Sequence, residues 1–293
     1  MKLGVNLCFA IKRWIDPAQL AGIVKNDLGL DYAQYTWDLT DPWWPEEPRD
    51  KLARQYAKAF REAGVAIEST FGGLASYTYS HFLAPTEDLR ALGAQHLARA
   101  IDMTAAMEVT ATGMPFGSYS ASDAVNPARR EEIYRIALDL WAEAARHAKK
   151  RGLSALLVEP VPLGTEFPAS SSDALRLMRD LDGQTDVPVR LLVDWGHALY
   201  EPLFKQDADM ELWMKTCGDY IHSFHIQQTD GQLDCHWNFT RDGLVSAKIL
   251  RDFWERHHLR EQTFLMEIIY PFEERDEVVL QDMTKAVRLL KAA

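Results

Sequence analysis

The feature that most constrains the fold is a regular alternation between short apolar runs and longer segments with helical spacing. The apolar runs are rich in Val, Ile, Leu, Phe or Thr and are bounded by polar or turn residues, which is typical of β-strands. Strands that alternate with helices favour a parallel sheet. The sequence therefore predicts eight strands, at residues 3–8, 32–36, 66–71, 109–113, 154–158, 189–193, 221–226 and 264–268.

Helical patterns occupy most of the segments between these strands. Apolar residues recur three and four positions apart in 49–63 and 87–107, and most clearly in 128–151. The last of these segments ends in Lys-Lys-Arg-Gly, where cations favour the helix dipole and Gly suits a cap. Further helices are predicted at residues 172–181, 210–217, 246–257 and 276–290.

Eight strand–helix units in 293 residues average about 37 residues each, which fits a (β/α)8 TIM barrel. We therefore interpret residues 1–293 as a single TIM-barrel catalytic domain. A doubly wound open sheet is the alternative. It ranks second because the first strand is followed by Cys8-Phe9-Ala10-Ile11-Lys12 and not by a glycine-rich phosphate-binding turn.

Composition narrows the class of protein. Hydrophobic residues make up 47% of the chain and charged residues 26%, as in ordinary globular proteins. The formal net charge of −11 argues against a nucleic-acid partner, which needs a basic face. No stretch approaches the ~20 apolar residues of a membrane span. Three cysteines without paired spacing, and an N-terminus unlike a secretory leader, predict a cytoplasmic protein without a disulfide framework.

Each of the last four predicted strands leads into an acidic residue or a histidine. Glu159 and Asp194 each follow a Leu-Leu-Val run, His225 follows Ser-Phe, and Glu267 follows Phe-Leu-Met. Reactive groups of a parallel barrel lie at the carboxyl ends of its strands. Adjacent strands are about 4.8 Å apart, so four side chains at one height can converge.

These four residues predict a site for one divalent metal ion. A charge after an apolar run is costly unless it is paired or bound to a metal. Three carboxylates and one imidazole suit Mn²⁺, Mg²⁺ or Co²⁺ better than a thiolate-seeking metal. Taken singly, each residue has a simpler interpretation, Asp194 as a helix N-cap and His225 as a core histidine. Their occurrence on four consecutive strands favours the metal site.

The order Glu, Asp-x-x-His, His, Glu on these strands resembles the xylose isomerase-like sugar isomerase and epimerase barrels, typified by the ketose 3-epimerases. The resemblance implies that His197 binds substrate and that one ion, Mn²⁺ in first place, is held by Glu159, Asp194, His225 and Glu267. Its partner would be a small sugar or sugar phosphate in carbohydrate metabolism. Self-association into a homo-oligomer is compatible with this interpretation.

One position departs from the free-ketose epimerases. In those enzymes an Arg follows the strand-seven His by six residues, and Gly231 stands there in this chain. The segment 227–240, with its Gln-Gln-Thr-Asp-Gly and His-Trp-x-Phe-Thr stretches, is more similar to the D-erythrulose 1-phosphate 3-epimerase branch. The segment 4–14 is also similar to that branch. The missing Arg argues against a free hexulose as substrate.

The resemblance implies proton exchange through an enediolate. Glu159 and Glu267 would act as bases on opposite faces of the planar intermediate, and His197 would donate to a substrate oxygen. The same site would also serve a lyase or decarboxylase acting on a 3-keto sugar acid or 3-keto glycoside. Metal-dependent phosphodiester hydrolysis and a non-catalytic sugar-sensing barrel are further alternatives.

Four other residues are weaker candidates for substrate contact. Lys12 and Arg13 follow the first strand and are placed to hold a phosphate or carboxylate, or to form a solvated loop pair. His236 and Arg241 follow the seventh strand, in a region where barrels often bind phosphate. A structural role is the alternative for both.

Overall fold

The computed structural model describes residues 1–292 and contains a closed ring of eight parallel strands. The strands are β1 (Lys2–Asn6), β2 (Tyr32–Thr36), β3 (Ala66–Phe71), β4 (Ala111–Pro115), β5 (Ala155–Glu159), β6 (Val189–Asp194), β7 (Ile221–Ile226) and β8 (Thr263–Met266). They pair in chain order, and β8 pairs with both β7 and β1. The predicted (β/α)8 barrel is therefore confirmed.

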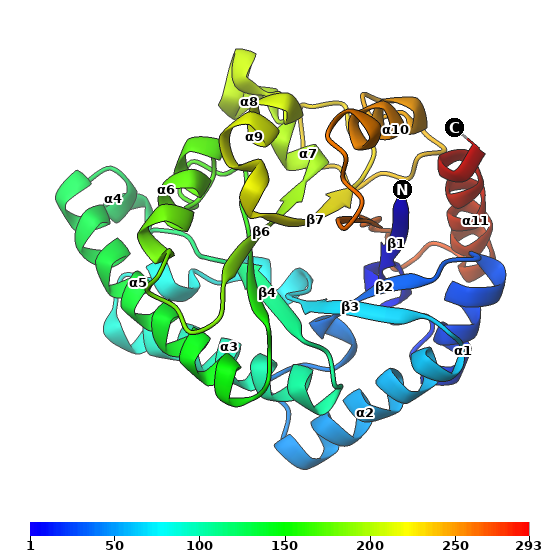
Figure 1. The fold of residues 1–293 in the computed structure, drawn as a ribbon, viewed down its shortest axis with the longest axis horizontal. Coiled ribbons are helices and arrows are strands. Elements are labelled where there is room, and N and C mark those ends of the chain that lie inside the picture. The colour runs from blue at the N-terminus through cyan, green and yellow to red at the C-terminus, as the bar shows by residue number, and fades with distance from the viewer. Residues whose placement is uncertain (293) are drawn as a thin grey trace.

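Helices form an outer ring around the strands (Figure 1). They are α1 (Pro17–Gly22), α2 (Glu46–Glu62), α3 (Glu87–Ala106), α4 (Ala121–Ala124), α5 (Pro127–Lys150), α6 (Ser171–Leu181), α7 (Trp195–Ala198), α8 (Glu201–Phe204), α9 (Met210–Cys217), α10 (Ala247–Arg256) and α11 (Asp276–Ala292). Side chains cap several of them. The hydroxyl of Ser170, for example, accepts from the backbone of Asp173 at the start of α6, and the Asp173 carboxylate returns the bond.

The observed ends of the strands and helices agree with the predicted ends in some elements and differ in others. Strands β2, β3 and β7 and helix α9 have the predicted bounds. The prediction for the first strand was too long, because the Asn6 side chain accepts from the backbone N–H of Cys8 and starts a 3-10 turn, Leu7–Ala10. Strand β4 begins at residue 111 and not at 109, because Glu108 adopts a left-handed backbone (φ 60°) after α3. The eighth strand ends at Met266, short of the predicted residue 268.

The sequence did not predict the helical segment after β1. It comprises α1 and a following π-helical stretch, Ile23–Asp27. Its α-helical part has only six residues, which is too short to show a helical period. The short helices α4, α7 and α8 were missed for the same reason.

The core has two parts. A large cluster of buried apolar side chains fills the space between the strand ring and the helices. A smaller cluster comes from β3 to β6 alone and contains Phe71, Ala111, Ala155, Leu157 and Leu192. Such a layer is expected inside a small barrel, which is packed with side chains.

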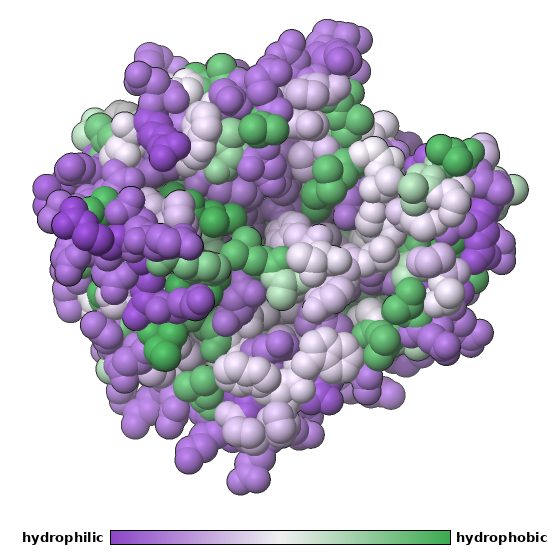
Figure 2. All heavy atoms as spheres, turned by 180° about the vertical axis from the view of Figure 1, so that it is seen from behind, coloured by the Kyte–Doolittle hydropathy of each residue, from purple (hydrophilic) through white to green (hydrophobic). Residues whose placement is uncertain are grey.

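The opposite face from that of Figure 1 is hollowed near its centre, and both hydrophilic and apolar residues border the hollow (Figure 2). Among residues 1–292, no helix combines the length and the apolar character needed to cross a membrane.

Candidate metal centre

The four predicted ligand residues meet at one point. Ligand atoms of Glu159, Asp194, His225 and Glu267 all lie within 4.8 Å of one another. The strand register explains this meeting, because Asp194 and His225 are direct partners on β6 and β7, and Glu267 follows the last residue of β8. All four are buried, with exposed fractions between 0% and 6%. Charged groups so deep in the protein require compensation.

The imidazole of His225 lies between the two glutamates. Its Nδ1 is 2.9 Å from Oε1 of Glu159 and 2.8 Å from Oε2 of Glu267. Its Nε2 is 2.6 Å from Oε1 of Gln34, and because a carbonyl oxygen can only accept, Nε2 carries the proton. Burial disfavours a charged imidazole, yet the carboxylates of Glu267 and Glu159 raise the pKa of His225 to about 10. The geometry thus demands positive charge between the carboxylates.

Asp194 provides an independent test of whether a metal ion fits. Its Oδ1 accepts from the backbone N–H of His197 (2.8 Å) and from the amide of Gln227 (2.9 Å), so this carboxylate also caps α7. Its Oδ2 is buried and has no hydrogen-bond partner. Burial raises the pKa of Asp194, and the neighbouring His197 opposes that shift. A buried oxygen left without a donor is the atom that a cation would bind.

Uncharged polar side chains from the first half of the barrel support this centre. The amide of Asn6 on β1 donates to Oε1 of Glu267 (3.1 Å) and to Oε1 of Gln34 (2.8 Å). The amide of Gln34 in turn donates to Ser69 on β3 (2.9 Å). The hydroxyl of Tyr77, in the 3-10 turn Leu74–Thr78, donates to Oε2 of Glu159. Burial raises the pKa of Tyr77 well above its usual value, and the charge of Glu159 raises it further.

A cavity of about 370 Å³ opens beside the centre. Glu267 lines it, so one of the two glutamates faces the space that a small molecule would occupy. Its walls are otherwise mainly apolar, and Asp234 and His236 add polar groups to them. The lining residues are Cys8, Thr36, Gly73, Leu74, Tyr77, Val161, Pro162, Leu163, Tyr200, Leu233, Asp234, His236, Glu267 and Ile269.

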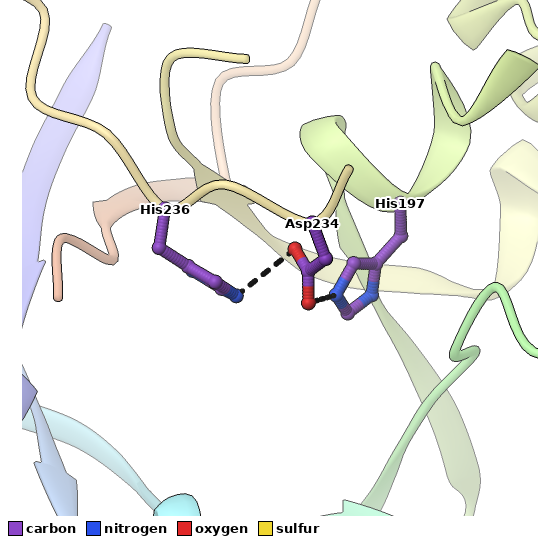
Figure 3. A group of neighbouring side chains, drawn as sticks. All are labelled: His197, Asp234 and His236. Atoms are coloured by element: carbon purple, nitrogen blue, oxygen red, sulfur yellow. Dashed lines mark hydrogen bonds and ion pairs between the residues drawn. The ribbon is translucent and has the colours of Figure 1, made fainter. Parts of the chain in front are cut away.

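Two of the predicted substrate residues, His197 and His236, lie next to the metal centre and both contact Asp234 (Figure 3). The Nε2 atom of His197 is 3.2 Å from Oδ2 of Asp234, and Nε2 of His236 is 3.1 Å from Oδ1. Although burial opposes it, Asp234 raises the pKa of His236 to about 9, and it raises the pKa of His197 well above its usual value. The sequence interpretation did not single out Asp234.

The other predicted substrate residues lie apart from the cavity walls. Arg13 contacts the C-terminal segment, with Nη1 2.7 Å from Asp276 and Nη2 2.6 Å from the carbonyl of Pro271. The ammonium of Lys12 lies over the ring of Phe272, 4.8 Å from its centroid. The guanidinium of Arg241 stacks over Trp237 in the same way, at 5.4 Å. None of the three side chains lines the cavity, and their contact with substrate stays a prediction.

Gly231, where the free-ketose epimerases carry an Arg, occupies a tight turn. Its backbone is left-handed (φ 75°), and a Cβ at this position would lie 3.1 Å from the carbonyl of Leu199. Its N–H donates to the hydroxyl of Thr229 (3.0 Å). A large side chain is therefore disfavoured here by backbone conformation as well as by space.

Several supporting residues carried weak sequence signals. Asn6 and Gln34 are polar residues inside strands that are otherwise buried, and a buried polar side chain calls for a partner. Asp234 precedes His236 by two residues, a spacing that could have been noticed. Gly196, within Asp-Trp-Gly-His, leaves room for Gln227, whose amide carbon would lie 2.5 Å from an added Cβ.

Known proteins that resemble this chain have the same fold. Residues 25–255 match the family described as xylose isomerase-like TIM barrel. A D-erythrulose 1-phosphate 3-epimerase of Brucella abortus (strain 2308) is 27% identical over 241 residues, which cover 82% of this chain and 77% of that protein.

Solved structures share the fold. A crystal structure of a Rhodospirillum rubrum ATCC 11170 protein, provisionally named a xylose isomerase, is 69% identical with a TM-score of 0.99, and the match covers 100% of this chain and 99% of that one. A D-psicose 3-epimerase of Clostridium cellulolyticum H10 has a TM-score of 0.70 and 12% identity over 100% of this chain and 99% of that one. At that identity the second likeness concerns the fold alone.

Proposed function

Because the chain belongs to the xylose isomerase-like TIM barrel family, as its motifs predicted, we propose that it is a divalent-metal-dependent 3-epimerase of a ketose phosphate or ketose. The observation that carries the proposal is the convergence of Glu159 and Glu267 on one point. Both carboxylates lie within 2.9 Å of the same imidazole nitrogen of His225, which supports one ion held between them and two bases close to one bound substrate.

The donor set suits a hard cation, with Mn²⁺ as our first choice. Glu159, Asp194, His225 and Glu267 would hold it, and the unpartnered Oδ2 of Asp194 supports this assignment. When bound, such an ion supplies Lewis-acid stabilisation for the negative charge that develops as a carbon next to a carbonyl loses its proton.

The chain's own residues would carry the proton steps. One glutamate removes the proton from carbon 3, and the other returns a proton to the opposite face. Glu267 already faces the cavity, and the hydroxyl of Tyr77 fixes the orientation of Glu159 by donating to Oε2. The apolar walls formed by Leu74, Val161 and Leu163 keep water from the reacting carbon.

The similarity to the Brucella protein supports a ketose 1-phosphate as the first substrate to test. The turn at Gly231 supports the same choice, because it lacks the Arg that the free-ketose epimerases place there. The proposal includes a cytoplasmic location, where the protein would meet a dissolved sugar phosphate.

The test is proton exchange during turnover. Chelator-stripped protein reloaded with Mn²⁺ is incubated in D₂O with four- to six-carbon ketose 1-phosphates, with the free ketoses and with 3-keto sugar acids. We expect the carbon-3 epimer of a ketose phosphate, with deuterium at carbon 3 by NMR. For erythrulose 1-phosphate the epimer is the mirror image, and polarimetry detects it.

Two outcomes would overturn the proposal. Release of CO₂ from a 3-keto acid without epimerisation of any ketose would indicate a lyase. Formation of an aldose would indicate an aldose–ketose isomerase, because the proton would then move between carbons 1 and 2.

A further inference from the structure

A second cavity lies at the amino ends of the strands, on the side of the barrel away from the candidate metal centre. Its volume is about 460 Å³, and it is bordered by the first residues of β1 and β2, the turn before β2, helix α10 with the turn that follows it, and the end of α11. Figure 1 shows the start of β1 between α10 and α11. Sites for small ligands are commonly about 300–1,000 Å³, so a small molecule has enough room here.

Basic side chains dominate this cavity, although the chain as a whole has a net charge of −11. Four of them line it, namely Lys2, Arg251, Arg260 and Lys291. Among its described lining residues only Asp31 is acidic, and its carboxylate pairs with Nζ of Lys25 at 2.6 Å. The carboxylate of Glu261 lies 3.9 Å from Nζ of Lys2, but it is 89% exposed, so water screens that pair. A cluster of like charges is unfavourable unless an anion lies among them.

The guanidinium groups of Arg251 and Arg260 have no partner of opposite charge within residues 1–292. Arg256, on the same helix as Arg251, shows the contrast, because its guanidinium pairs with the carboxylate of Glu211. The Nε atom of Arg251 is buried and has no hydrogen-bond partner. A partly buried charge without a partner is costly. A guanidinium presents its donors in a planar fork that fits the oxygens of a phosphate or a carboxylate.

Contacts with the protein hold two of these cations at the cavity wall. The guanidinium of Arg260 lies over the indole ring of Trp254, 4.3 Å from its centroid. The ammonium of Lys291, in the last turn of α11, donates to the carbonyl of Gly29 in the turn before β2. Neither contact neutralises a charge, so both side chains are positioned and remain fully cationic.

We propose that Lys2, Arg251, Arg260 and Lys291 form a binding site for a small polyanion that carries phosphate or carboxylate groups. The cluster of positive charges calls for more than one negative charge, and the cavity has room for more than one charged group. Such a ligand would connect β1, α10 and α11, which are distant in sequence, and we therefore expect it to stabilise the fold. It would not compete with a molecule at the carboxyl ends of the strands.

The experiment measures binding of three probes, inorganic phosphate, pyrophosphate and citrate, by titration calorimetry. The full chain is first stripped of metal, so that no probe binds through an ion at the other end of the barrel. We expect a single saturable site per chain and a higher melting temperature when it is filled. Tighter binding of pyrophosphate would identify phosphorylated molecules as the ligand class, and tighter binding of citrate would identify polycarboxylates.

Variants locate the site. Arg251→Gln and Arg260→Gln should each weaken binding of the preferred probe by about 10-fold or more, because each removes a charge-assisted contact. Arg256→Gln is the matched control on the same helix and should bind normally, because Arg256 does not line the cavity. Glu159→Gln, which disables the proposed epimerase, should also bind normally, so the two proposals can fail separately.

Two results would overturn the proposal. The first is the absence of saturable binding of all three probes to the unaltered protein at millimolar concentrations. The second is equal binding by the unaltered protein and by the double variant Arg251→Gln/Arg260→Gln, with circular dichroism as the test of folding, which would place the bound anion elsewhere.

Discussion

The two halves of the barrel contribute different chemistry to the same site. The carboxyl ends of strands β5 to β8 and the residue after β8 provide every one of the predicted metal ligands, two of which are also the proposed bases. Strands β1 to β3 and the turn after β3 contribute uncharged groups, the amides of Asn6 and Gln34 and the hydroxyl of Tyr77. The second half of the barrel thus provides the charged side chains, and the first half provides the neutral hydrogen-bond donors and acceptors that orient them.

This division has a physical reason. Buried carboxylates repel one another unless positive charge lies between them. Hydrogen-bond donors that are themselves neutral can hold such carboxylates in position without changing the net charge of the site. Neutral amides and hydroxyls meet that need, because they restrict a carboxylate without competing for a cation. We therefore expect substitutions of the predicted ligands in the second half of the barrel to abolish turnover. Substitutions of the neutral residues in the first half should lower activity or metal affinity by smaller factors.

The largest effect is expected from the proposed bases. Glu159→Gln and Glu267→Gln should each lower kcat for epimerisation by about 10²- to 10⁴-fold, because the amide cannot accept the proton. Stopped assays on protein of verified fold measure this loss. Glu261→Gln, at an exposed ion pair with Lys2, is the matched control and should remain active. A kcat within threefold (~0.6 kcal/mol) of the normal value in either base variant would contradict the assignment of the reactive groups to the second half of the barrel.

The next effect concerns Gln34, the first-half residue whose side chain contacts His225 most closely. Gln34→Leu leaves the Nε2 proton of His225 without its acceptor, and we expect Mn²⁺ affinity to fall about 10- to 100-fold. Titration calorimetry measures it. Ser69→Ala removes only the neighbour of Gln34 and should cost less, about threefold. Undiminished Mn²⁺ affinity in Gln34→Leu would show that His225 keeps its orientation without the hydrogen bond to Gln34.

A smaller effect is expected at Tyr77. Tyr77→Phe removes the hydroxyl that donates to Glu159 and should lower kcat about 10-fold, the equivalent of one hydrogen bond to a charged group. Metal content should stay the same, which separates orientation of the base from loss of the ion. Tyr79→Phe is the control, because this neighbouring tyrosine is 53% exposed and does not line the cavity.

The smallest effect concerns stability alone. Burial lowers the pKa of both His81 and His96 to about 4, and the charge of Arg99 contributes to the lowering at His96. The two imidazole rings stack on each other, and Trp43 stacks on His96. Because the folded pKa is below the unfolded value of about 6.5, stability is complete above pH 6.5 and falls as the pH drops toward 4.

His96→Phe should therefore reduce the loss of stability between pH 7 and pH 5 by on the order of 1 kcal/mol. Thermal unfolding at both pH values measures this change, and kcat at neutral pH should not change. A variant with the pH dependence of the unaltered protein would show that His96 does not contribute to acid sensitivity.

The sequence predicted those parts of the site that have a local signal. Glu159, Asp194 and Glu267 each end an apolar run, so their position at a strand end is visible without a structure. The eight alternating strand–helix units predicted a barrel, in which the carboxyl ends of all strands lie on the same side. The closed ring of strands confirms the predicted barrel, and in it Asp194 and His225 are direct partners on β6 and β7.

The supporting residues lacked such a signal because their partners are distant in sequence. Gln34 and His225 are 191 positions apart, and Asn6 and Glu267 are 261 apart. Only the closed ring brings them together. Asp234 lies in a loop, where an acidic residue is ordinarily solvated, so its role depends on the two histidines that the fold places around it.

Closure of the ring by β8 also fixes the order in which a new polypeptide can mature. Glu267 emerges after nine-tenths of the chain (roughly 90%) has been synthesised, and its orientation depends on Asn6 from the first strand. No shorter nascent chain holds a complete ligand set. The proposed ion would consequently find its full ligand set only late in the synthesis of the chain.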